Sequence, residues 1–156
     1  SPLALISRSA EGICPREIPH IFLPCSRFHP INRLHMMDIE RYREYCLALP
    51  HVTEELPFND VTPVYKVGGK IFAFYGTDDF AAGINLKCDP DRAVELRDRW
   101  PDDILPGYHM NKKHWNTVRP LGNLPESLLL ELTRHSYDLV CRSLPRQVRT
   151  ELEKRK

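Results

Sequence analysis

The sequence predicts an α+β domain in which helices pack on one face of an antiparallel β-sheet. Two β-rich runs are separated by Gly68-Gly69, a dipeptide typical of tight hairpins. Segments with helical periodicity begin at capping residues and end at prolines. The resulting order is helix, antiparallel strands, helix, strand, helix, which indicates a layer of helices on a single sheet.

Length and charge limit what the chain can be. Its 156 residues, 42% of them hydrophobic and 28% charged, suit one globular domain with an extension. The 22 Lys and Arg against 21 Asp and Glu give a net charge of +1. This balance provides no bulk attraction to nucleic acid, so such a partner requires a local basic patch. No apolar run approaches the ~20 residues of a bilayer span, so we expect no membrane partner.

Residues 1–36 differ from the rest of the chain. Prolines recur every few residues and interrupt any helical or strand period. We therefore expect a proline-rich N-terminal extension outside the fold, a single domain over 37–145 and a charged tail over 146–156. The sequence leaves open whether the extension is native or upstream translated sequence. Without its charges the remainder carries a net −1.

The five cysteines are an odd set without a C-x-x-C pair, which argues against a disulfide scaffold or zinc ribbon. Such usage fits a reducing, cytoplasmic compartment. One cluster resembles a metal site only superficially, because its spacing matches no zinc-finger pattern. It comprises Cys14, His20, Cys25 and His29. We expect neither a metal nor a cofactor.

The N-terminal elements follow from caps and alternation. Asp38 can cap a helix that Pro50 ends, and a loop over 53–60 follows it. The runs 61–67 and 70–75 form the hairpin, in which each glycine takes the positive φ that a type I′ turn requires. The next expected strand is 82–87. On it, Asn85 and Lys87 point to one side, and Ile84 and Leu86 to the other.

The C-terminal elements are equally bounded. Asp89-Pro90 opens a helix that runs to about Trp100, because proline at the first turn loses no hydrogen bond. Residues 102–110 are expected as a loop and 113–119 as a short strand. Pro125 opens a long helix with an apolar stripe, and Pro145 interrupts it.

Several short motifs occur in one order across the domain. They are 45–50 (YCLALP), Phe58, 66–73 (KVGGKIFA), 86–90 (LKCDP), 106–115 (PGYHMNKKHW) and 136–140 (SYDLV). With these motifs, residues 37–145 resemble the MmcQ/YjbR family of small bacterial proteins. The resemblance implies a compact α/β domain related in shape to the double-wing DNA-binding architecture. DNA binding is then an expectation by analogy of fold.

The segment 108–119 carries the candidate site, because it holds three cations and no acidic residue. Basic groups beside an aromatic ring suit phosphate contact and stacking. The hairpin and its neighbouring strand can extend this patch. The predicted DNA-binding residues are Lys66, Lys70, Lys87, His109, Asn111, Lys112, Lys113, His114, Trp115 and Arg119. The alternative is that the lysines protect sheet edges and Trp115 packs in the core.

Alternation along an extended 113–119 separates these two interpretations. Lys113, Trp115, Thr117 and Arg119 would share one face, and His114, Asn116 and Val118 the other. A buried Trp115 would then draw two cations toward the core, which is costly unless they snorkel. The pattern therefore favours a binding surface. We expect the contacts to be with backbone phosphates and to specify no base sequence.

Two other functions compete with DNA binding. An enzyme is not expected, because the chain has no G-x-S-x-G, phosphate loop or H-E-x-x-H. The adjacent carboxylates Glu54-Glu55 and Asp102-Asp103 are expected in solvated turns. The second alternative is a protein-interaction module that uses uncovered aromatic residues. The aromatic candidates are Phe58, Phe72, Phe74 and Tyr75.

Overall fold

The structure, a computed structural model, describes residues 37–108 and 110–155. The expectations for 1–36, including the Cys14–His29 cluster, lie outside these residues, as does His109. The described strands form one sheet in the order β1-β2-β3-β4-β6-β5, and all neighbours are antiparallel. They are β1 (Val52–Glu55), β2 (Val64–Val67), β3 (Lys70–Phe74), β4 (Ile84–Lys87), β5 (Ile104–Pro106) and β6 (Trp115–Val118).

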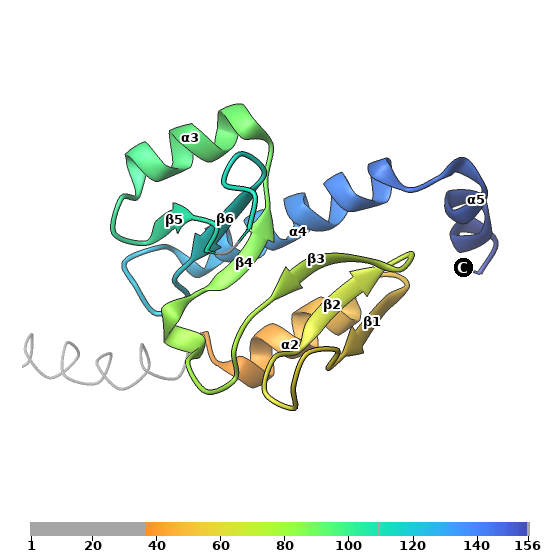
Figure 1. Cartoon of the computed structure of the whole chain (residues 1–156), viewed down its shortest axis with the longest axis horizontal. Helices are drawn as coiled ribbons and strands as arrows, with labels where there is room; N and C mark the ends of the chain where they lie inside the picture. Colours follow the sequence, from red (N-terminus) through yellow and green to blue (C-terminus); the bar gives the residue numbers. More distant parts are fainter. Residues whose placement is uncertain (1–36, 109, 156) are drawn as a thin grey trace, which may run out of the picture. The chain divides into compact units, whose positions relative to one another are not determined.

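Helices cover one face of this sheet, which confirms the predicted α+β class. They are α2 (Ile39–Ala48), α3 (Pro90–Arg99), α4 (Glu126–Ser143) and α5 (Arg146–Lys154). In Figure 1, α2 and α4 lie behind the strands. Side chains of α4 reach the sheet directly, since the Tyr137 ring lies edge-on to Phe72 of β3. We call this side the helix face and the opposite side the open face.

The predicted helix ends are confirmed. Asp38 caps α2, its Oδ1 accepting from the amide of Arg41 at 2.8 Å. Asp89 caps α3 through the amides of Asp91 and Arg92, with Pro90 in the first turn. The boundaries therefore follow from local chemistry.

A β-bulge in β3 decides which aromatic residue faces which side. Gly68 and Gly69 adopt φ of 56° and 82°, as a type I′ turn requires. Beyond the turn, Tyr65 pairs with Ala73 but Lys66 pairs with Ile71, so Phe72 is an extra residue. Phe72 is fully buried on the helix face and Phe74 is half-buried. Simple alternation would have placed both rings on the same side.

The two edge strands lie wholly or partly in predicted loops, and each predicted strand is shorter in the structure than expected. β1 begins at Val52 and runs into the predicted loop 53–60, and β5 lies within the predicted loop 102–110. These two strands form the edges of the sheet. Acidic residues in β1 and Pro106 in β5 weaken the strand signal in the sequence, although edge strands tolerate both. β6 covers only 115–118 of the predicted 113–119. Most of the predicted charged tail forms helix α5, and its Leu152 packs against the core.

Asp103 does not lie in a solvated turn, contrary to expectation. It is 5% exposed, and its carboxylate accepts from the amide of Asn123 at 3.1 Å. A Cβ on Gly122 would come within 1.9 Å of that carboxylate, so this turn requires glycine. Glu54 is also engaged, by Arg43 and Tyr65. Both carboxylates therefore contribute to the fold.

Within the described residues, no helix has the length and hydropathy needed to cross a bilayer. The three cysteines in this part of the chain are free thiols: Cys46, Cys88 and Cys141. Burial raises the pKa of Cys46 to about 12 and that of Cys88 to about 11. These two thiols are therefore neutral at pH 7 and act as small core residues.

Candidate nucleic-acid interface

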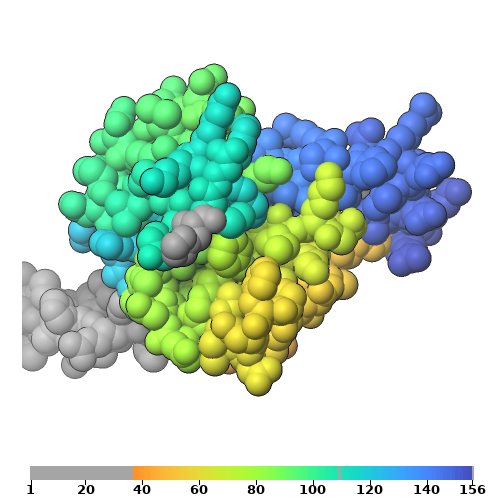
Figure 2. All heavy atoms as spheres, viewed as in Figure 1, coloured from red at the N-terminus to blue at the C-terminus, as the bar shows by residue number. Residues whose placement is uncertain are grey.

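The open face is defined by strand register. Asn85 pairs with Thr117, and Phe74 pairs with Asn85, so these three side chains share a side. The hydroxyl of Thr117 donates to Asn85 Oδ1 at 2.8 Å, which fixes both groups. No described helix lies in front of this face in Figure 1. Figure 2 shows the same side, with residues 104–108 and 110–118 in green-blue.

Four of the predicted site residues gather at one end of this face. Lys87 of β4 is paired with Trp115 of β6, which places their Cβ atoms within about 5.5 Å. Lys112 and Lys113 occupy the turn that leads into Trp115, and both are exposed. Among the described residues, these three lysines form no salt bridge. We call Lys87, Lys112, Lys113 and Trp115 the basic surface.

Trp115 is half-buried, with its ring 5.9 Å from the ring of Phe74 at an interplanar angle of 60°. It therefore rests on a neighbouring ring of the open face and leaves part of its indole accessible. Asn116 and Val118 are buried on the helix face, and Asn116 bonds Arg97 of α3 at 2.8 Å. The predicted alternation within the strand is thus confirmed for residues 115–118.

The turn that carries the two lysines is fixed by hydrogen bonds that involve Asn111 and Arg97. Asn111 Oδ1 accepts from the amide of Lys113 at 3.0 Å, and its carbonyl accepts from the amide of Trp115 at 3.0 Å. Arg97 donates to the carbonyls of Lys112 and Trp115. These bonds use backbone atoms, so both ammonium groups remain available for an external anion.

Three predicted cations lie elsewhere or are already engaged. Lys66 forms a salt bridge with Glu55. Lys70 Nζ donates to the carbonyl of Ser143, at the C-terminal end of α4, at 3.1 Å. Arg119 donates to the carbonyl of Asp102 at 3.1 Å.

Arg119 also follows the last residue of β6. It lies six residues after Lys113, or about 20 Å along an extended chain. The predicted stripe does not extend over 113–119, because β6 ends before Arg119 and begins after Lys113. What remains of the predicted site is the basic surface.

Of the remaining predicted site residues, His114 and Asn111 form hydrogen bonds that stabilise the fold. The carbonyl of His114 accepts from the amide of Cys88 at 2.8 Å, which extends the pairing of β4 with β6. Asn111 shapes the turn through its side chain. We therefore assign both a structural role. His109 lies outside the described residues.

Sequence reasoning missed part of the open face. Asn85 and Thr117 were on the expected side of their strands, yet polar uncharged side chains offered no charge signal. Phe74 could not be assigned from alternation because of the bulge at Phe72. No group of three or more potential metal ligands occurs within the described residues.

Comparison with known proteins places this fold among bacterial relatives. The family model YjbR matches residues 47–139. Protein YbdF of Escherichia coli O157:H7, an uncharacterized protein, is 39% identical over 108 residues, or 69% of this chain and 88% of YbdF. The uncharacterized protein YjbR of Escherichia coli K12 is 31% identical over 113 residues, or 72% of this chain and 95% of YjbR.

Solved structures agree with the sequence comparison. The crystal structure of Deinococcus radiodurans protein DR2400, with a DUF419 domain, has a TM-score of 0.71 and 41% identity, covering 76% of this chain and 89% of that one. A Pseudomonas syringae protein has a TM-score of 0.55 at 24% identity, covering 66% and 98%, which supports the fold alone. Matching motifs, topology and full-domain relatives lead to one conclusion: this chain belongs to the YjbR family.

Proposed function

We propose that the protein binds DNA by contacting backbone phosphates through the basic surface. One observation carries the proposal: the β4–β6 register places Lys87 beside Trp115, and the preceding turn adds Lys112 and Lys113. Ammonium groups attract phosphates, and an accessible indole packs against sugar or base.

The number of available cations sets the expected strength of binding. Each phosphate contact contributes about −0.9 to the slope of log affinity against log salt. Three lysines therefore predict a slope of about −2.7 and modest affinity. No arrangement of side chains on the basic surface suggests a preference for particular bases, so we propose contacts that position the protein without reading sequence.

The proposal is tested by fluorescence anisotropy with a labelled duplex at several salt concentrations. In a Lys112→Gln/Lys113→Gln variant, affinity should fall and the salt slope should lose about 1.8, because two phosphate contacts are removed. Folding should be unaffected, since both side chains are exposed.

Lys154→Gln is the matched control. It removes an exposed lysine at the end of α5, so binding should be retained. Equal affinity and slope for the double variant and the unmodified chain would refute the proposal.

A second candidate function, binding of a protein partner, rests on exposed aromatic residues. Phe58 is 72% and Tyr108 is 73% exposed. Large exposed rings are common at protein interfaces. Under this alternative, Phe58→Ser would abolish capture of the partner while DNA affinity stayed unchanged.

We further propose a binding role without catalysis, in the cytoplasm. The non-catalytic role is supported by the raised pKa values of the buried Cys46 and Cys88 thiols, which make them poor nucleophiles. The cytoplasmic location is supported by the described cysteines, which are unpaired. Loss of function on substitution of either cysteine by serine, with the fold retained, would count against the non-catalytic role.

A further inference from the structure

A cavity of about 400 Å³ lies on the open face, between the edge strand β5, the strands β4 and β6, and the turn before β4. This volume lies within the usual range for small-molecule sites. Thr117, which is 8% exposed, and the half-buried Asn85 form its floor. The exposed Tyr108 and Asp79 lie at its rim. We call it the open-face cavity.

The polar groups of the open-face cavity offer a ligand both a donor and an acceptor. Asn85 Oδ1 already accepts from the Thr117 hydroxyl, and Asn85 Nδ2 donates no hydrogen bond within the described residues. Asp79 Oδ1 accepts from the amide of Ala82 at 3.2 Å, and its other oxygen accepts none in that part of the chain. A nucleobase presents donors and acceptors together on its Watson–Crick edge. A base can therefore donate to Asp79 and accept from Asn85.

The ring of Tyr108 provides a surface on which such a base can stack. This side chain is 73% exposed, and its own backbone amide donates to Thr117 Oγ1 at 3.3 Å. The residue is thereby fixed next to the floor of the cavity. Aromatic rings stack on the bases of single strands with little regard to sequence.

The open-face cavity is continuous with the basic surface. Asn85 precedes Lys87 by two residues on the same side of β4, which separates them by about 7 Å. A single nucleotide can span this separation between its phosphate and its base. Asp79 precedes β4, whereas Lys87 ends it, so the carboxylate and the lysine lie at opposite ends of the strand. This polarity keeps phosphates at the lysine end and leaves the carboxylate for a base.

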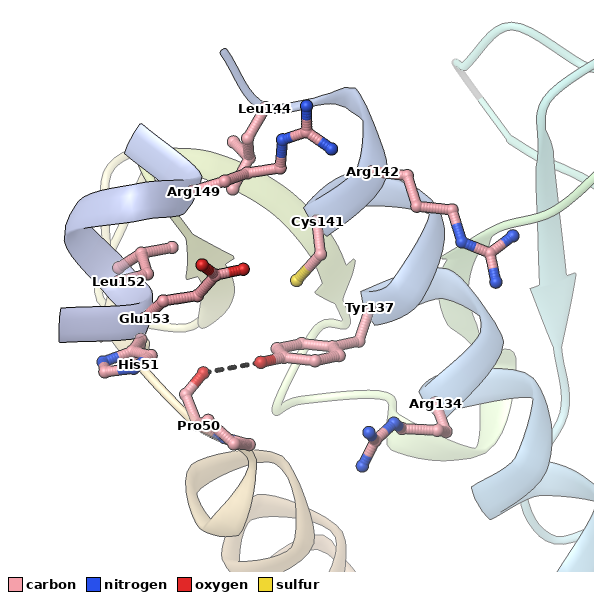
Figure 3. Close-up of a pocket in the computed structure, with 10 residues that line it drawn as sticks. All are labelled: Pro50, His51, Arg134, Tyr137, Cys141, Arg142, Leu144, Arg149, Leu152 and Glu153. Carbon is pink, nitrogen blue, oxygen red and sulfur yellow. Dashed lines mark hydrogen bonds between the residues drawn. The ribbon is translucent and has the colours of Figure 1, made fainter. Parts of the chain in front are cut away.

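A second cavity, between α4, α5 and the turn after α2, lacks such a match. It has a volume of about 300 Å³ and shares no residue with the basic surface. Figure 3 shows the Glu153 carboxylate pointing into it and the Arg149 guanidinium pointing away from Glu153. Another of its three arginines, Arg134, pairs with Asp138 at 3.2 Å. The charges around this cavity therefore select no single class of ligand.

We propose that the open-face cavity binds an unpaired base of single-stranded DNA whose phosphates lie on the basic surface. This role rests on the proposed function and narrows it to single strands, because a duplex keeps the Watson–Crick edges of its bases paired. Asn85 and Asp79 bond the edge of the base, and Tyr108 stacks on its face. Trp115 stacks on a neighbouring base of the same strand.

The test is fluorescence anisotropy of the full chain with three labelled probes of equal length. They are a thymidylate strand, an abasic strand with the same number of phosphates, and a thymidylate–adenylate duplex. The thymidylate strand should bind roughly tenfold more tightly than either other probe, because only its bases can both stack and form hydrogen bonds in the cavity.

A matched pair of variants assigns this preference to the cavity. Ala82 lines the cavity and Ala81 does not, although both are exposed in the same turn. Ala82→Leu fills part of the cavity, so affinity for the thymidylate strand should fall roughly fivefold or more while affinity for the abasic strand stays unchanged. Ala81→Leu should retain the full preference for bases.

A second pair tests stacking at the rim. Tyr108→Ala should lower affinity for the thymidylate strand roughly fivefold or more, and Tyr108→Phe should restore it, because stacking requires the ring and not the hydroxyl.

Equal affinity for the thymidylate and abasic strands, or equal effects of Ala82→Leu and Ala81→Leu, would overturn the role of the cavity. The basic surface would still stand if the Lys112→Gln/Lys113→Gln variant weakened binding of the duplex. Failure of the unmodified chain to bind any of the three probes would refute the proposed function as well.

Discussion

The two faces of the sheet differ in how completely the protein satisfies its own groups. On the helix face, the Tyr42 hydroxyl bonds Thr133 at 3.0 Å, and the Tyr65 hydroxyl bonds Tyr75 at 3.0 Å. On the open face, Lys87 has no carboxylate partner among the described residues, and Trp115 stays partly accessible.

This difference indicates a division of roles between the faces. A fully paired, buried face determines which fold is stable, and any change there costs stability. The open face contributes less to folding, so its lysines and indole can be used for a ligand. Neighbouring residues that point to opposite faces should therefore respond differently to substitution.

The largest expected contrast is between two phenylalanines of β3. Phe72→Ala should lower the free energy of unfolding by about 3–5 kcal/mol, because the ring is fully buried against Tyr65 and Tyr137. Phe74→Ala should cost about 1–2 kcal/mol, since this ring is half-buried. Urea unfolding at equilibrium measures both. Equal losses would show that the open face is as essential to the fold as the helix face.

A smaller contrast concerns two hydroxyls. Ser136 Oγ donates to the carbonyl of Phe72 and accepts from the amide of Lys87 at 2.8 Å. Ser136→Ala leaves both groups without this partner and should cost about 1–3 kcal/mol. Thr117→Val removes a bond to the half-buried Asn85 and a longer bond, 3.3 Å, from the amide of the exposed Tyr108. It should cost about 1 kcal/mol, less than Ser136→Ala, because water can reach both partners.

Thermal unfolding of the two hydroxyl variants gives the comparison directly. A Thr117→Val variant that is less stable than Ser136→Ala would contradict the proposed division between the faces.

The smallest effect is a dependence on pH at the edge strand β1. The hydrogen-bonded Arg43 guanidinium lowers the pKa of Glu54, although burial opposes the shift. A lowered pKa in the folded state contributes stability above the ordinary carboxyl pKa, and this is lost as pH falls through the lowered value. Arg43→Gln should therefore reduce the acid dependence of Tm between about pH 7 and about pH 3. An unchanged profile would exclude this pair as a source of acid sensitivity.

Much of the fold could be predicted because its signals are local. Asp38 and Asp89 mark helix starts, and Gly68-Gly69 marks the hairpin, through chemistry that acts within a few residues. β1 and β5 were missed because they are short edge strands, stabilised by pairing with strands distant in sequence.

The candidate site was predicted only in part. Alternation grouped Lys87 with Asn85 on β4 and Trp115 with Thr117 on β6, and the pairing of the two strands puts both groups on one side. The engagement of Lys66 by Glu55 and of Lys70 by Ser143 depends on contacts across strands or between the hairpin and α4. The open-face cavity gave no signal, because the turn before β4 and the edge strand β5, which are distant in sequence, complete it.

The amino-acid order by itself determined the α+β class, the helix boundaries and which residues within β4 and within β6 share a side. Caps, turns and alternation are properties of adjacent residues, so they can be read along the chain. Only the tertiary structure decided which lysines stay available, which phenylalanine is buried and where the open-face cavity forms. These outcomes depend on which distant groups meet in three dimensions, as at Lys66 with Glu55 and Tyr137 with Pro50.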